Sequence, residues 1–380
     1  MASRFRLKLR SEIESSADNR RFGSGWLSGV IALIGSVAAL LVMVCLLAPS
    51  LFTTPQLQEN LSALPIRFLL QLLLVFSFGF ALLSLMLRES KILGFTAIGL
   101  IVGVTFLGQL SAYQASATGG MPSFGLDWFI LNVLFTGMLF IPMERLFPLL
   151  PEQNMFRQEW REDMFYYFIS SMMVQILSFI TLIPSNVILG ETGVERVHGL
   201  IASQPLIVQF IEIMFLTDLL QYWVHRSFHR IPALWKFHAV HHSAKSLDWV
   251  AGARMHFVEI LVLRGLTVIP MMVLGFEVAV VHAYILVVYI YSTFIHANIR
   301  WPLKRVARVM ATPRFHHWHH GIEKEAIDVN FAIHFPLLDR MFGTYYMPED
   351  KWPQGYGVGG HPVPSGYMAQ FFYPFRGSKN

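Results

Sequence analysis

Long apolar segments constrain the fold of this chain more strongly than any other feature of its sequence. Eight segments reach the ~20 residues that a helix needs to cross a bilayer: residues 26–47, 66–87, 92–113, 126–148, 164–184, 200–224, 258–276 and 278–295. Of all residues, 54% are hydrophobic and only 14% are charged, which is far more apolar than an ordinary soluble domain. The sequence therefore predicts an all-α integral membrane protein, folded as a multi-span helical bundle.

Basic residues predict how this bundle is oriented. Six Lys or Arg residues precede residue 26, whereas the expected loops 49–65 and 114–125 contain none. Since basic residues gather on the cytoplasmic side of a membrane, we expect the N-terminus to be cytoplasmic. The even number of spans places the C-terminus and a histidine-rich cap on the same side. The first segment lacks the cleavage pattern of a signal peptide, so we expect it to be retained.

The histidines divide the chain into two parts. Residues 1–140 contain none, and we interpret them as an accessory N-terminal transmembrane region. Residues 141–380 contain all 15, of which 12 fall between His225 and His320, and we predict that this part carries the chemistry. The one cysteine, Cys45, excludes a disulfide framework and a cysteine-based zinc or iron–sulfur site. No nucleic-acid-binding motif accompanies the net charge of +5, so no nucleic-acid partner is expected.

The histidine spacing predicts metal binding. An isolated HxxxH pair occurs once, and the longer pattern HxxHH occurs twice. Side chains three or four residues apart on a helix can share one metal ion. Eight imidazoles exceed what one tetrahedral or octahedral ion can take, so the count predicts two ions. Imidazole suits iron, zinc, copper and nickel alike, so ligand type leaves the metal open. The eight are His225, His229, His238, His241, His242, His316, His319 and His320.

Carboxylates near these histidines are further candidates. Asp218 and Tyr222 fall on the same helical face as His225 and His229, about two turns deeper in an apolar segment, where a charge usually marks function. We predict that this face borders the channel through which a lipid tail reaches the metals. Alternatively, Asp218 orients a metal-binding histidine through a hydrogen bond. That orienting role is also considered for four other carboxylates: Asp248, Glu259, Asp328 and Asp339.

Six sequence runs resemble the fatty acid hydroxylase/sterol desaturase superfamily of membrane di-iron oxygenases. The resemblance covers about residues 140–375, with the histidine clusters and their flanks in the same order. Three departures, Phe257, Ala332 and Leu338, remove no candidate ligand. The runs are ERLFP (144–148), EWREDMFYY (159–167), DLLQYWVHRSFHRIPALWKFHAVHHS (218–243), RMHFVE (254–259), TPRFHHWHH (312–320) and LLDRMFGTYY (337–346).

The resemblance implies a function and two more site residues. It implies O2-dependent hydroxylation, desaturation or ether cleavage on a membrane lipid, with two iron ions as cofactor and electrons from a separate transfer protein or reductase. The eight clustered histidines match the family's ligands, and His296 matches a further single ligand. His256 matches a recurrent position at which a ligand and a supporting residue are both compatible with the pattern.

A second class of function stays open from the sequence. The chain could be a non-oxidative histidine-rich metal-binding membrane protein, such as a zinc hydrolase or a metal or haem carrier. Against the hydrolase, no HExxH string occurs. Against a haem carrier, the clusters are expected at helix ends and not deep in facing spans. The sequence specifies neither the lipid, nor the electron donor, nor the oligomeric state.

Overall fold

The computed structural model is mostly helical in the part of the chain that it describes. This part comprises residues 2–54, 66–111 and 126–172, isolated positions between 180 and 188, and residues 195–301, 305–359 and 363–376. An isolated antiparallel bridge joins Gly321 and Tyr356, and no residue of this part is assigned to a strand. The predicted all-α fold class is therefore confirmed.

Two compact units make up the chain. The first consists of Met1–Arg157 and Phe168–Val174, and the second of Gln158–Tyr167 and Gln175–Asn380. Helix α8 (Trp160–Met172) is divided between them. The division at residues 140 and 141 was predicted from where the chemistry lies, and it stays a prediction.

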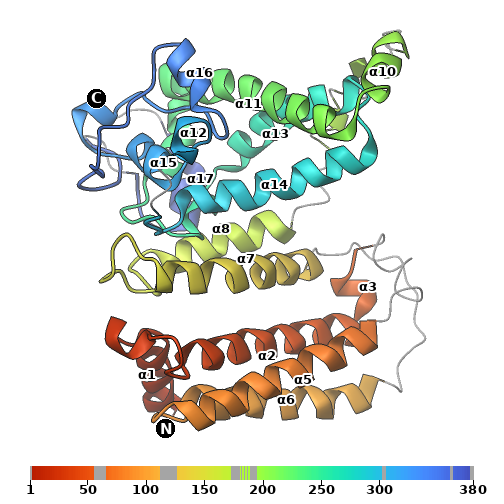
Figure 1. Cartoon of the computed structure of the whole chain (residues 1–380), viewed down its shortest axis with the longest axis vertical. Helices are drawn as coiled ribbons and strands as arrows, with labels where there is room; N and C mark the ends of the chain where they lie inside the picture. The colour runs from red at the N-terminus through yellow and green to blue at the C-terminus, as the bar shows by residue number, and fades with distance from the viewer. Residues whose placement is uncertain are drawn as a thin grey trace. The chain divides into compact units, whose positions relative to one another are not determined.

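The first unit is a helical bundle around α2. Small residues allow close helix packing, because Gly29 and Gly35 of α2 leave no room for a Cβ beside Ser84 and Ser77 of α5. Ser84 also donates a hydrogen bond of 2.8 Å to the carbonyl of Gly25, just before α2. Figure 1 shows α2, α5 and α6 side by side. The helices are α1 (Ala2–Ile13), α2 (Trp26–Leu47), α3 (Pro49–Phe52), α5 (Ile66–Leu87), α6 (Ile92–Ser111) and α7 (Leu126–Leu146), with the 3₁₀ turn η1 (Ala17–Arg20) between α1 and α2.

The second unit brings the histidine-bearing helices together. Proline at 232 ends α11 and begins α12, because it restricts Ile231 to an extended conformation and suits the first helical turn. The chain can therefore turn sharply between the two helices (Figure 1). The helices are α10 (Glu195–Ala202), α11 (Leu206–Arg230), α12 (Pro232–His242), α13 (Phe257–Val273), α14 (Val278–His296), α15 (Pro313–His319), α16 (Pro336–Met341) and α17 (Tyr367–Phe372).

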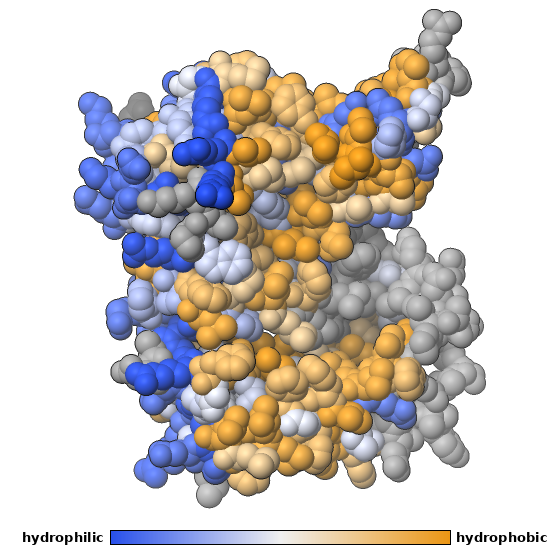
Figure 2. All heavy atoms as spheres, in the orientation of Figure 1, coloured by the Kyte–Doolittle hydropathy of each residue, from blue (hydrophilic) through white to orange (hydrophobic). Residues whose placement is uncertain are grey.

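Four of the described helices are long and apolar enough to cross a membrane: Trp26–Leu47, Phe68–Leu87, Leu206–Arg230 and Val278–His296. Helix segment Ile92–Leu107 is apolar but shorter. The predicted span 164–184 lies partly outside the described residues. Within each unit, Figure 2 shows hydrophobic side chains along the long helices and hydrophilic ones gathered toward one end. Membrane helices are thus present, and the predicted orientation stays a prediction.

Candidate metal centre

Nine of the ten histidines predicted as ligands form two groups. Within each group, one nitrogen of every ring lies within 4.8 Å of the others. Each HxxHH motif contributes to both groups, so neighbours in sequence are not always neighbours in the site. The five-histidine group contains His225, His229, His238, His242 and His319, and the four-histidine group contains His241, His296, His316 and His320.

The two groups lie next to each other and are shielded from solvent. The stacked rings of His242 and His320, one from each group, have centroids 4.3 Å apart. The exposed fraction is 6% or less for eight of the nine histidines. The ninth, His229, has a side chain that is 6% exposed. These histidines come from α11, α12, α14 and α15 and the residue after α15, so the site forms where the ends of four helices meet.

Nε2 atoms converge within the five-histidine group. The Nε2 of His238 lies 3.0 Å from that of His225 and 3.1 Å from that of His242. The Nε2 atoms of His242 and His319 are 3.0 Å apart. Nitrogens bound to one ion at about 2.0–2.1 Å lie about 3 Å from each other. The spacing in this group therefore fits a shared ion.

The four-histidine group has the same geometry. The Nε2 of His316 lies 2.9 Å from that of His296 and 3.1 Å from that of His320. The Nε2 atoms of His296 and His241 are 3.2 Å apart. Each HxxHH motif is divided between the groups in the same way, because its two histidines four residues apart enter one group and its third histidine enters the other.

Backbone carbonyls define the tautomers of these rings. The Nδ1 of His225 lies 2.9 Å from the carbonyl of Phe331, and the Nδ1 of His319 lies 2.8 Å from that of Val329. In the other group, the Nδ1 of His241 lies 3.0 Å from the carbonyl of Arg254. A carbonyl only accepts, so Nδ1 carries the proton in each ring and Nε2 presents a lone pair.

Lone pairs face each other between His225 and His238, at 3.0 Å, and between His241 and His296, at 3.2 Å, because the Nδ1 of each of these rings contacts a carbonyl or a carboxylate. That arrangement favours a cation. Protonation does not supply it easily, because burial lowers the pKa of His242, His319 and His320 well below the usual range for histidine. Neutral nitrogen donors 3 Å apart repel one another, whereas a metal ion between them converts the same geometry into bonds. The donor set therefore fits one metal ion in each group.

Two of the carboxylates singled out in the sequence hold these histidines. Glu259, buried on α13, has Oε1 2.5 Å from the Nδ1 of His238. Asp328 lies 3.4 Å from the Nδ1 of His229. A carboxylate in this position orients the ring and raises the basicity of the nitrogen that faces the metal. The third, Asp248, instead accepts from the backbone N–H groups of residues 250 and 251.

The loop 328–335 presents its carbonyls to the five-histidine group. Asp339 accepts hydrogen bonds from the N–H groups of Phe331 and Ala332, at 2.7 and 3.0 Å. Asn330 adopts a positive φ of 58° and donates to the carbonyl of Phe315, at 2.9 Å. Asparagine tolerates this backbone region better than most residues. Sequence reasoning did not identify this loop, because its role depends on main-chain atoms.

Asp218 also holds this loop. Its Oδ1 accepts from the N–H of Ile333 at 2.8 Å, and its Oδ2 accepts from His334 and Phe335 at 3.1 and 2.7 Å. Both oxygens are thus occupied by backbone amides, so the expected hydrogen bond to the ring of a metal-binding histidine is not the contact observed. The structure assigns Asp218 to positioning residues 333–335.

Tyr222 has a similar structural environment. Its ring is fully buried against Phe331 and Leu338, and its hydroxyl lies 2.9 Å from Oγ1 of Thr344. Arg226 donates to the same hydroxyl at 3.1 Å. The predicted place of Asp218 and Tyr222 beside a lipid channel at the catalytic site stays a prediction, and these contacts favour support of the loop instead.

His256 is the predicted ligand that lies outside both groups. Its Nδ1 accepts from the N–H of Val258 at 3.1 Å, which caps the start of α13. Its Nε2 lies 2.9 Å from the carbonyl of Phe371. Both ring nitrogens therefore have backbone partners, and the geometry favours the supporting role over the ligand role that the sequence left open.

Comparison with known proteins agrees with this site. The family model described as fatty acid hydroxylase matches residues 210–344, which contain all nine grouped histidines. Ornithine lipid hydroxylase OlsE of Rhizobium tropici is 28% identical over 45% of this chain and 51% of its own length. Alkylglycerol monooxygenase of Danio rerio is 30% identical over 35% of this chain and 30% of its own length. Lathosterol oxidase of Homo sapiens is 27% identical over 48% of this chain and 63% of its own length.

The match to the family model lies within the histidine-bearing part. The chain spans about half the length of the ornithine lipid hydroxylase and less than a third of the alkylglycerol monooxygenase. No solved structure matches it significantly. The matched segment carries both the family pattern and the complete pair of histidine groups. Residues 210–344 match the fatty acid hydroxylase family, and this part of the chain carries the resemblance to the fatty acid hydroxylase/sterol desaturase superfamily.

Proposed function

We propose that this protein is an O2-dependent di-iron oxygenase that hydroxylates or desaturates a C–H bond of a membrane lipid. The observation that carries the proposal is the pair of adjacent, buried groups of neutral Nε2 donors inside the segment that matches the fatty acid hydroxylase family. Residues 141–380 form the catalytic part in this proposal, and the five- and four-histidine groups each hold one iron. Two bound irons supply the redox chemistry that an unactivated C–H bond requires.

The chain's own residues position and isolate the site. Main-chain carbonyls hold the rings of His225, His319 and His241 so that each Nε2 faces inward. Glu259 holds His238 in the same way. Burial of these rings keeps bulk water away, which favours oxidation of the substrate over side reactions.

The position of the site favours a lipid substrate. Both α11 and α14 are apolar enough to span a membrane, and both end in histidines of the two groups. A lipid chain lying beside these helices could therefore reach the site without first crossing water. The names of the relatives, a lipid hydroxylase and an alkylglycerol monooxygenase, support the same substrate class.

The overall stoichiometry requires an electron donor. Hydroxylation inserts one oxygen atom into the C–H bond and reduces the other to water, with two electrons and two protons. A separate transfer protein or reductase would supply these electrons. The six basic residues before α2 support placing the site and both termini on the cytoplasmic side.

Metal analysis and lipid mass spectrometry test this proposal together. We expect about two irons per chain and oxygen consumption that depends on a lipid. Deleting the gene should remove a mass difference of one oxygen atom, or of two hydrogens, in one lipid class, and re-expression should restore it. Stable zinc loading without oxygen uptake would instead support the non-oxidative metal-binding alternative.

A further inference from the structure

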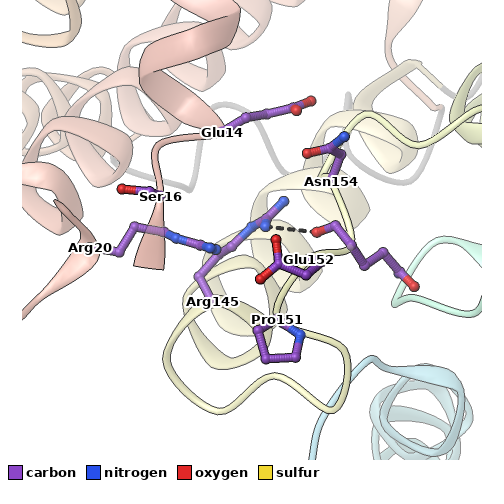
Figure 3. Close-up of a pocket in the computed structure, with 8 residues that line it drawn as sticks. Glu14, Ser16, Arg20, Arg145, Pro151, Glu152 and Asn154 are labelled. Carbon is purple, nitrogen blue, oxygen red and sulfur yellow. Dashed lines mark hydrogen bonds between the residues drawn. The ribbon is translucent and has the colours of Figure 1, made fainter. Parts of the chain in front are cut away.

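A second polar site lies in the first unit, within residues 14–154. A cavity of about 230 Å³ lies between the segment that follows α1 and the loop that follows α7. Figure 3 shows the residues that line it. Its lining includes two guanidinium groups, from Arg20 and Arg145, and the carboxylate of Glu152. None of the lining residues belongs to the histidine groups or to the matched hydroxylase domain.

Arg20 carries unsatisfied hydrogen-bonding capacity. Only 8% of this residue is exposed, and its Nε and Nη1 are buried without a hydrogen-bond partner among the described residues. Leaving a charged donor unpaired in a buried position is costly. Glu152 attracts the guanidinium, but burial has the larger effect and lowers the pKa of Arg20. Two nitrogens of this guanidinium therefore remain available to a hydrogen-bond acceptor in the cavity.

The other charged groups in the lining restrict what the partner can be. Arg145 donates to the carbonyl of Gln153 at 3.0 Å, which fixes its guanidinium at the cavity. Glu14 already accepts from Arg10 and from the N–H of Phe156, at 3.3 and 3.1 Å. A purely anionic ligand would meet the carboxylate of Glu152 and be repelled by it. A ligand with one negative and one positive group would match both Arg20 and Glu152.

The location favours a lipid as the source of such a ligand. Arg20 lies six residues before Trp26, where the candidate membrane helix α2 begins. Phe22, two residues after Arg20, is 87% exposed, and Phe5 and Leu7 of α1 are 51% and 66% exposed. Apolar side chains beside arginines are typical of segments at the membrane surface.

We propose that this cavity binds the head group of an aminophospholipid, a phosphodiester joined to a primary ammonium. The phosphate pairs with the guanidinium of Arg20, with Arg145 beside it, because guanidinium matches phosphate geometry. The ammonium pairs with Glu152. The acyl chains lie against the exposed side chain of Phe22, between Arg20 and the start of α2. This site is distinct in residues and in ligand from the histidine groups.

Ligand-dependent thermal stability of the full-length protein in detergent tests the proposal without any substitution. Short-chain phosphatidylethanolamine should raise the melting temperature more than short-chain phosphatidylglycerol does. Inorganic phosphate at the same concentration should have little effect. An equal shift with inorganic phosphate would identify a free-anion site and overturn the lipid assignment. An equal shift with both lipids would overturn the assignment of the ammonium to Glu152.

Two substitutions and a matched control locate the site. Arg20→Gln should weaken the apparent affinity for phosphatidylethanolamine about tenfold or more, since a charged hydrogen-bonded pair is lost. Glu152→Gln should leave binding but remove the preference over phosphatidylglycerol. Arg21→Gln, next in sequence and exposed, should behave as the parent. If Arg20→Gln binds as tightly as Arg21→Gln, the site is not at this cavity. Should Arg20→Gln fail to fold, Glu152→Gln and the lipid series still give a decisive result.

Discussion

The five-histidine and four-histidine groups differ in what holds their rings. The first is supported by two carboxylates, Glu259 and Asp328, and by carbonyls of the loop 328–335. The second is supported by the carbonyls of Arg254 and Ser292, which lie 3.0 and 2.7 Å from the Nδ1 atoms of His241 and His296. Negative partners raise ligand basicity more than neutral ones do. The two histidine groups thus have unequal electrostatic support, and we expect that they can be perturbed separately.

The largest effect should come from removing one ring from either group. We expect His319→Ala and His316→Ala each to reduce activity by more than the roughly 100-fold that changes in supporting residues can cause. Each loses a nitrogen donor, so iron content should fall first in the affected group. Iron analysis and lipid turnover measure both. Near-parental values for either variant would remove that histidine from the ligand set.

His317→Ala is the matched control for these variants. Its Nδ1 lies 2.7 Å from the hydroxyl of Tyr356, and it belongs to neither group. Iron content should therefore stay near that of the parent.

The next largest effect should come from the ion pair that fixes Arg254. Its guanidinium lies 2.5 Å from Asp163, and both side chains are almost fully buried. Removing one partner of a buried ion pair costs about 3–5 kcal/mol. We expect Asp163→Asn to lower the melting temperature and, by shifting the carbonyl of Arg254, to reduce iron in the four-histidine group. An equal loss of iron from both histidine groups would contradict the expectation that the two groups are supported separately.

Glu259→Gln should perturb the opposite group. The neutral amide no longer accepts as strongly from His238, so we expect a 10–100-fold loss of metal affinity in the five-histidine group. Iron titration should then show one weakened site per chain. Asp328→Asn serves as a graded comparison, because Asp328 is 25% exposed and 3.4 Å from its histidine, and its effect should be smaller. A larger loss of metal affinity in Asp328→Asn than in Glu259→Gln would show that the distance and burial of a carboxylate do not determine how strongly it supports its histidine.

The smallest effect should come from Asp218→Asn. An asparagine oxygen can accept from some of the three amides, but its NH2 group then opposes another. The expected cost is about 1–3 kcal/mol in the free energy of unfolding. Most iron and the oxidised carbon position should be retained. A changed product position with an unchanged melting temperature would support the predicted lipid channel instead.

Residue spacing predicted which histidines are candidate ligands, but not how they divide between the two groups. Positions i+3 and i+4 point about 100° apart on a helix. His241 and His242 can therefore enter different groups although both are neighbours of His238. Which ring enters which group depends on how α14 and α15 pack against α12, and this information is not local. His296 was identified by family resemblance, since no other histidine lies near it in the sequence.

The contacts of Asp218 and His256 could not be predicted from the sequence, for one physical reason. Asp218 was interpreted from its depth in an apolar helix, but its partners are amides more than a hundred residues away. His256 was matched by sequence, but its nitrogens are occupied by Val258 and Phe371. Backbone partners leave little trace in a sequence, because every residue type offers a carbonyl and nearly all offer an N–H.

The carbonyl contacts of Val329 and Ser292 have a consequence for genetic screens. Both orient a histidine through an atom that no side-chain replacement removes. Neither side chain is fully buried, so many substitutions should leave the contact in place. A library of single substitutions would therefore score these two positions as tolerant. Inserting or deleting one residue beside them should instead abolish activity. A position in this protein that tolerates substitution can still contribute a backbone atom that the site requires.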